Sequence, residues 1–258
     1  MLKPDPPPPP PRETLGITHT GWKAAAIGLV MACALTFFPL LSFLLSPLTI
    51  IVHEIGHTVV LWLFGFPAIP AFDFANGGGV TLSDLERAPS TIWAWGVGVL
   101  ALGWWQRLRP PVLVALGVGV LVYFWMYDSV RETLAITLGG HAGELAFATL
   151  FLYRGLTGWG CRIEVERFLY AFIAFMIFFA SLRLGLSLSG DAMERYWYLQ
   201  GKGGIDHDLV TGSRILSWRL ESAARALMAL TLAAVPLAFL AASKRRIIGA
   251  VAESEEPL

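Results

Sequence analysis

Three residues inside an apolar segment have the types and the spacing of a metal-dependent hydrolytic site. His53, Glu54 and His57 lie in the segment TIIVHEIGHTVVLWLFG, residues 49–65, and form an HExxH pattern. On a helix, side chains four residues apart share one face, so the two imidazoles can bind one metal ion. Glu54 follows the first histidine and can reach a water on that metal as a general base. The pattern predicts a zinc-dependent hydrolase; the alternative is a pair of structural histidines and an ion-paired glutamate in a helix bundle.

A third metal ligand must come from another part of the chain, because catalytic zinc usually takes three protein ligands and leaves one position for water. Glu144 is the first candidate, because it lies near the middle of the apolar segment 133–153, as His57 does in its own segment. His141 lies one turn before Glu144 on the same face. We expect His141 to hydrogen-bond an oxyanion or to support the metal site, with simple helix packing as the alternative. Asp191, at the end of a later apolar segment, is the alternative third ligand.

Glycines surround His141 in the same segment. Gly139, Gly140 and Gly143 form part of the sequence GGHAGEL. Small residues let helices in a membrane approach each other closely. We therefore expect this segment to pack directly against the helix that carries the two histidines.

The composition indicates a membrane protein. The chain has 258 residues, of which 55% are hydrophobic and 15% charged, whereas a soluble domain has about 25% charged residues. Several apolar runs approach the ~20 residues that cross a bilayer as a helix. The fold class we predict is an all-α, multi-pass transmembrane bundle of about 6–8 spans, in a bacterial plasma membrane. The expected spans are residues 24–45, 48–65, 92–105, 112–127, 133–153, 168–188 and 226–242.

The two ends of the chain differ from this apolar region. Residues 1–22 are rich in proline and are expected to form a disordered tail, and residues 244–258 a polar tail. The metalloprotease-like domain then covers residues 23–243. Basic residues near both ends favour a cytoplasmic location for each of them, which requires an even number of crossings. The formal net charge of zero does not favour a nucleic-acid partner.

The segment after the motif has an extended character. Residues 66–90 contain prolines and the run NGGGVT, which are typical of turns and extended backbone. A strand or hairpin here could pair with the backbone of a substrate beside the metal. A plain connecting loop is the alternative. At the other end of the motif segment, Pro47 is expected to separate two helices.

An HExxH motif within a transmembrane helix, a preceding span and a glycine-bearing extended segment resemble the site-2 protease family of intramembrane zinc metalloproteases. The resemblance covers about residues 45–82. It implies that His53 and His57 bind Zn²⁺, that Glu54 is the general base, and that the substrate is a membrane protein or peptide. The family's third ligand is an aspartate in a Leu-Asp-Gly motif, which this sequence lacks; the nearest counterpart is Asp191.

The sequence is also compatible with two hypotheses in which the protein is not an active protease. One is a membrane metal-binding protein or transporter that uses the same cluster without hydrolysis. The other is an inactive protease relative that binds membrane partners, against which the intact Glu54 argues. The two cysteines, Cys33 and Cys161, form no CxxC pair and do not predict a thiolate metal site.

Overall fold

The computed structural model describes residues 13–35, 37–73, 78–201, 206–244 and 246–248. Within the described part the elements are mostly helices. They are α1 (His19–Leu35), α2 (Pro39–Leu63), α3 (Pro89–Trp105), α4 (Pro110–Met126), α5 (Val130–Thr157), α6 (Glu164–Gly190), α7 (Ala192–Leu199), α8 (Asp208–Ile215) and α9 (Leu220–Ser243). The strands are β1 (Glu13–Leu15), β2 (Ala68–Asp73), β3 (Gly78–Ser83) and β4 (Arg246–Ile248). Of the two predicted tails, residues 1–12 and 249–258 lie outside the described residues, whereas the inner parts of the tails contain strand β1, the start of helix α1 and strand β4.

Four of the described helices, α2, α5, α6 and α9, are long and apolar enough to cross a membrane. The protein is therefore a helical membrane protein. Helices α1, α3 and α4 have 17 residues each, about 25 Å of helix, which is slightly short of a ~30 Å hydrocarbon core. The larger number of six to eight spans stays a prediction.

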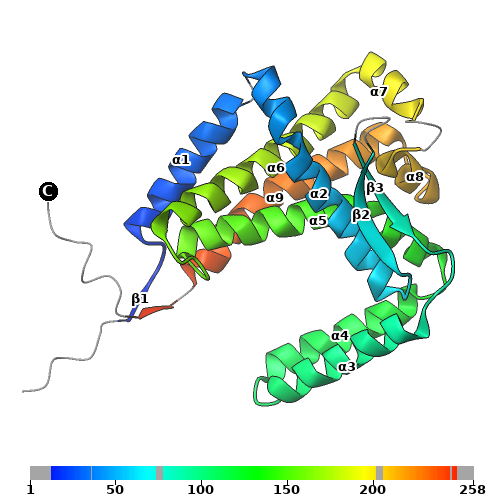
Figure 1. Ribbon diagram of the computed structural model, residues 1–258, viewed down its shortest axis with the longest axis horizontal. Coiled ribbons are helices and arrows are strands. Elements are labelled where there is room, and N and C mark those ends of the chain that lie inside the picture. Colours follow the sequence, from blue (N-terminus) through cyan, green and yellow to red (C-terminus); the bar gives the residue numbers. More distant parts are fainter. Residues whose placement is uncertain (1–12, 36, 74–77, 202–205, 245, 249–258) are drawn as a thin grey trace, which may run out of the picture.

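The bundle is built around α5 and α6, which pack against α1 and α9 (Figure 1). Its core consists mainly of small and aliphatic side chains, with Phe175 and Phe178 of α6 also buried there. Leu152 and Leu156 of α5 and Ile177 of α6 are fully buried there. Alanines such as Ala174 let the helices approach closely, as small residues do in membranes. This core lies beside the end of the bundle where α2, α5 and α8 meet.

Pro47 does not separate two helices, contrary to the prediction. It lies inside α2, and the break falls instead before Pro39, which occupies the first turn of that helix. Proline in a helix interior leaves the carbonyl four residues earlier without its usual donor. Here the hydroxyl of Ser46 donates to the carbonyl oxygen of Phe43 at 2.8 Å and replaces that donor. The helix therefore continues through the proline to the HExxH motif.

The extended segment after α2 is a β-hairpin rather than a plain loop. Strands β2 and β3 pair antiparallel, with Pro70 opposite Thr81 and Phe72 opposite Gly79. Trp62 near the end of α2 donates its indole N–H to the carbonyl of Ala68 at 2.8 Å, which ties the hairpin to the helix. The hairpin lies along α2 beside the motif (Figure 1).

Arg87 connects the exit of the hairpin to the start of α5. Its guanidinium lies 2.7 Å from a carboxylate oxygen of the buried Glu132 and 3.4 Å from Asp128. It also covers the ring of Tyr127 at 4.4 Å. Helices α3 and α4 run between these points as an arm that leaves the bundle, and neither contains a buried residue (Figure 1).

Candidate metal centre

The two histidines of the motif face α5, and the two helices approach each other backbone to backbone. An added Cβ at Gly56 would lie 2.4 Å from the carbonyl oxygen of Gly139, and one at Gly143 would lie 2.5 Å from the Cα of Gly56. Only glycine allows this separation. The close helix approach predicted from the glycines is therefore present, and it brings His53 and His57 against α5.

Hydrogen bonds at Nδ1 fix the orientation of both imidazole rings. Nδ1 of His57 donates to the carbonyl oxygen of Ile136 at 2.8 Å, because a carbonyl can only accept. Nδ1 of His53 faces Oε1 of Glu144 at 3.1 Å. A neutral imidazole that donates from Nδ1 keeps its lone pair on Nε2. Such partners on the far side of the ring are typical of metal-binding histidines.

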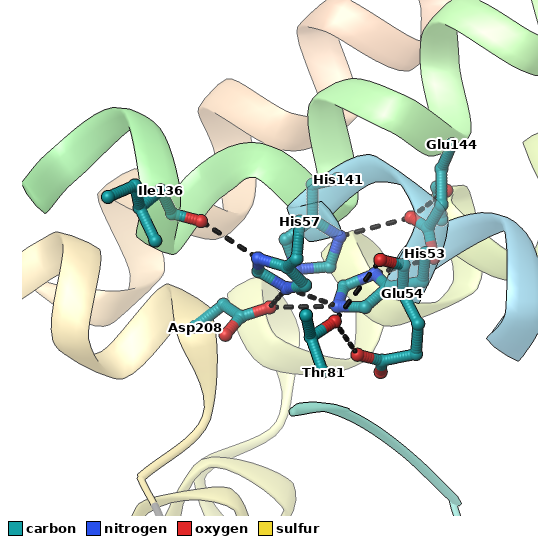
Figure 2. A network of polar contacts seen from close by, with 9 residues as sticks. His53, Glu54, His57, Thr81, Ile136, His141, Glu144 and Asp208 are labelled. Atoms are coloured by element: carbon teal, nitrogen blue, oxygen red, sulfur yellow. Dashed lines mark hydrogen bonds and ion pairs between the residues drawn. The ribbon is translucent and has the colours of Figure 1, made fainter. Parts of the chain in front are cut away.

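Both Nε2 atoms converge on the carboxylate of Asp208, as Figure 2 shows. Oδ2 of Asp208 lies 2.8 Å from Nε2 of His53 and 2.9 Å from Nε2 of His57. The two Nε2 atoms are 3.1 Å apart. Three ligands of a tetrahedral zinc ion with bonds of about 2.0–2.1 Å lie about 3.3 Å from one another. The three atoms are therefore arranged so that a small outward shift would make room for the ion.

Asp208 is placed by a short helix outside the long spans. It is the first residue of α8, which packs against α5 and α9 through buried Leu209 and Val210. Burial alone would raise the pKa of Asp208, but in the metal-free site, where Nε2 of His53 and of His57 carry the protons that a metal would displace, hydrogen bonds from these Nε2–H groups hold that pKa well below its usual value. The carboxylate is therefore ionised, as a metal ligand must be.

Gly140 leaves open the space between the histidines. A Cβ built on Gly140 would lie 2.3 Å from Nε2 of His53 and 2.5 Å from Nε2 of His57. These distances are close to metal–nitrogen bond lengths of ~2.0–2.1 Å. The residues thus fit a zinc ion, since a histidine pair and a carboxylate supply the ligands and a glycine keeps the space beside them free.

Glu54 lies on the neighbouring side of α2 and is held by the hairpin. Its side chain is buried, and Thr81 of β3 donates a hydrogen bond to Oε2 at 2.7 Å (Figure 2). Gly79 crosses directly over the carboxylate, since an added Cβ there would lie 2.2 Å from Oε1 of Glu54. The β-hairpin therefore fixes the position of the residue predicted as the general base.

Glu144 and His141, both predicted site residues, lie next to the histidine pair but on its other side. Oε2 of Glu144 lies 3.0 Å from Nδ1 of His141 and 3.1 Å from the hydroxyl of Ser181, while Oε1 contacts His53. His53, His141 and Glu144 form a second group that could hold a metal ion. Glu144 is thus close to the site, although it faces Nδ1 of His53 and not the Nε2 atoms that converge with Asp208.

Asp191, the alternative third ligand, has a different environment. Its carboxylate accepts hydrogen bonds from the backbone N–H groups of Met193 and Glu194 at 2.8 and 3.3 Å, and so caps the start of α7. Neither group of possible ligands among the described residues includes it.

Two residues at the site have no counterpart in the sequence prediction. Asp208 lies in the polar stretch 189–212, in which only Asp191 is a predicted ligand; the run Asp206-His207-Asp208, with three possible ligands in succession, is the signal that points to Asp208. Thr81 lies in the hairpin, and only its proximity in space links it to Glu54. No sequence spacing points to that contact.

A cavity of about 630 Å³ is bordered by the side chains of the candidate metal centre, which are His53, Glu54, His57, Thr81, His141, Glu144 and Asp208. It is bordered by α2 and α5, by β3, and by α8 with Tyr198 of α7. No family model matches the chain, and no curated protein or solved structure shows significant similarity to it.

Proposed function

We propose that the protein is an intramembrane zinc metalloprotease that hydrolyses peptide bonds of membrane-embedded substrates. The observation that carries the proposal is the convergence of His53, His57 and Asp208 on one point, in a cavity that also contains Glu54. Two histidines and a carboxylate are a common ligand set of catalytic zinc and leave a position for water. A zinc ion there would acidify a bound water and polarise the scissile carbonyl.

In this proposal Asp208, rather than Glu144 or Asp191, is the third ligand. Its Oδ2 is within 2.9 Å of both Nε2 atoms. Glu144 instead accepts the Nδ1 proton of His53 at 3.1 Å and orients that ring. Carboxylate–histidine pairs of this kind raise the basicity of the ligand.

The chain's own residues supply the proton transfers. Glu54 accepts a proton from the attacking water and delivers it to the nitrogen of the leaving amine. Thr81 keeps the carboxylate in position through its hydrogen bond. His141, which also borders the cavity, is suited to hydrogen-bond the oxyanion that forms at the carbonyl.

The shape of the cavity favours an extended peptide as substrate. Gly79, Val80 and Thr81 of β3 form one wall of it. The hairpin has two strands, and a peptide that added to the edge of β3 would gain backbone hydrogen bonds beside the metal. A helical substrate must unwind locally for this, because the carbonyl groups of an intact helix are already hydrogen-bonded.

The test compares wild type with Glu54→Gln, purified in detergent. We expect wild type to contain zinc, measured by mass spectrometry of the metal, and to cleave a synthetic transmembrane peptide. Glu54→Gln should retain the zinc and lose cleavage by ~10²–10⁴-fold, as expected when a general base is removed. Glu86→Gln, at an exposed glutamate after the hairpin, is the matched control and should behave as wild type.

Each other outcome contradicts part of the proposal. Wild type without bound metal would overturn the metal site. Cleavage by Glu54→Gln at the wild-type rate would overturn the role of the base. Zinc binding by wild type without cleavage of any membrane peptide would favour the non-proteolytic metal-binding reading.

A further inference from the structure

Helix α2 carries hydroxyl groups on the same side as its histidines. Ser42, Ser46 and Thr49 precede His53 at intervals of four, three and four residues, which places all four on one face. The three hydroxyl side chains are half-buried. Leu44, on the opposite side of the helix, is 61% exposed and faces the position of lipid. The polar face of α2 therefore points inward.

A second cavity lies against this hydroxyl face. Its volume is about 980 Å³, and it separates the first half of α2 from α6. On the α6 side it is bordered by Arg183 and Ser187, one turn apart, and at its far end by the exposed Asp191 and Glu194. These residues place polar groups on both walls of the groove, among apolar side chains such as Leu182 and Leu186.

The groove adjoins the cavity of the metal centre. Thr49 of α2 and Leu184 of α6 border both of them. Along α2 the hydroxyl face leads from Ser42 beside the groove, through Thr49, to His53 in the cavity of the metal centre. The next turn of α2 contains the HExxH motif itself.

Hydroxyl groups at this depth need partners other than hydrocarbon, because an unsatisfied polar group in a bilayer costs several kcal/mol. Ser46 and Thr49 donate their protons to backbone carbonyls of α2, at 2.8 Å in each case. Their oxygens keep lone pairs that face the groove and can accept from water. Polar residues in membrane helices generally face the bundle interior or a water-filled cavity.

We propose that the groove between α2 and α6 is filled with water and delivers it along the hydroxyl face of α2 to the metal centre. This proposal rests on the proposed function in one respect only, namely that the delivered water is consumed in peptide hydrolysis. Hydration of the groove itself requires neither zinc nor peptide cleavage, so the two proposals can fail separately.

Cysteine accessibility tests the proposal in protein reconstituted into lipid nanodiscs. The background is Cys33→Ala with Cys161→Ser, which removes both native thiols. Ser46→Cys is then treated with a membrane-impermeant methanethiosulfonate that carries a trimethylammonium group. Leu44→Cys, on the outer face of the same turn, is the matched control. A second pair, Thr49→Cys and Leu48→Cys, repeats the comparison if either first variant folds poorly.

The reagent reacts with the thiolate, which forms in water and is suppressed in apolar surroundings. We expect the inward cysteines to react at least ~10-fold faster than the outward ones, because only they contact water. Equal, slow reaction at both faces would show a dry groove and overturn the proposal. Equal, fast reaction, or faster reaction on the outer face, would overturn it as well, since the water would then not be confined to the groove.

Discussion

Adding one methyl group at Gly140 should abolish metal binding while the bundle remains folded. In Gly140→Ala the new Cβ would lie 2.3 Å from Nε2 of His53 and 2.5 Å from Nε2 of His57. Ordinary van der Waals contacts of a Cβ begin at 3.4 Å, so the shortfall is about 1 Å at each nitrogen. The methyl group and a metal ion cannot both occupy this space.

The helices cannot simply separate to make room. Gly56 of α2 is already in backbone contact with Gly139 and Gly143 of α5, and these contacts hold the two helices together. The imidazole rings must therefore rotate away, which removes two of the three ligand atoms from the site. The cost falls mainly on the metal and much less on the buried core of Leu152 and Leu156 farther along α5.

The magnitude follows from linkage between binding and unfolding. A metal at 100 times its dissociation constant stabilises the folded state by ~2.7 kcal/mol. For a chain of this size that corresponds to a rise of ~5–10 °C in the unfolding midpoint. We expect wild type to show this rise on addition of zinc and Gly140→Ala to show none.

The assay is thermal unfolding of the chelator-treated protein in detergent, with and without added zinc. Gly119→Ala, in α4 where an added Cβ meets no atom within 4 Å, is the control and should respond to zinc as wild type does. If Gly140→Ala is stabilised by zinc as strongly as wild type, the metal does not lie between the two Nε2 atoms and the assignment of the centre is refuted.

Three further predictions concern the residues around the site. Asp208→Ala should lower zinc affinity by more than Glu144→Gln, for which the loss of a supporting hydrogen bond gives ~10–100-fold; calorimetric titration with zinc measures both. Thr81→Val should lower kcat/KM for peptide cleavage by ~10–100-fold at unchanged zinc content, because a hydrogen bond to a charged carboxylate is worth ~1.5–3 kcal/mol. Arg87→Gln should lower stability by ~3 kcal/mol, since it leaves the buried carboxylate of Glu132 without its charged partner; the unfolding midpoint reports it.

Each of the three predictions can be contradicted by a specific result, and two of them have a control variant. If Glu144→Gln removes zinc more completely than Asp208→Ala, Glu144 is the third ligand. Thr81→Ser restores the hydroxyl and should restore activity; if it does not, the hydrogen bond is not the reason for the loss. Arg107→Gln, at an exposed arginine in the turn between α3 and α4, should leave the midpoint unchanged, and an equal fall in both variants would contradict the role given to Arg87.

Sequence patterns located those parts of the site that depend on local helix geometry. The spacing of His53 and His57 placed them on one face, and the glycines around His141 indicated the close contact of two helices. The membrane class followed from apolar composition, and the hairpin was one of two readings of the prolines and glycines after α2.

The remaining features depend on contacts that no local pattern encodes. Asp208 lies 151 and 155 residues after the two histidines and reaches them through the packing of α8 against α5. The rule that proline ends a helix was wrong at Pro47, because the hydroxyl of Ser46 satisfies the carbonyl that the proline leaves without a donor. Depth in the membrane favoured Glu144 as a ligand, but depth does not specify which ring nitrogen a carboxylate faces.

The short sheet formed by β1 and β4 also restricts how the chain is threaded through the bilayer. These strands pair antiparallel, with Thr14 opposite Ile247, so the segment before α1 and the segment after α9 meet on one side. An odd number of crossings would leave them in different compartments, so this pairing supports the even number that the basic residues at both ends predict. Reporter domains fused before β1 and after β4 should accordingly give the same topological signal, and from the basic residues flanking α1 and α9 we expect that signal to be cytoplasmic.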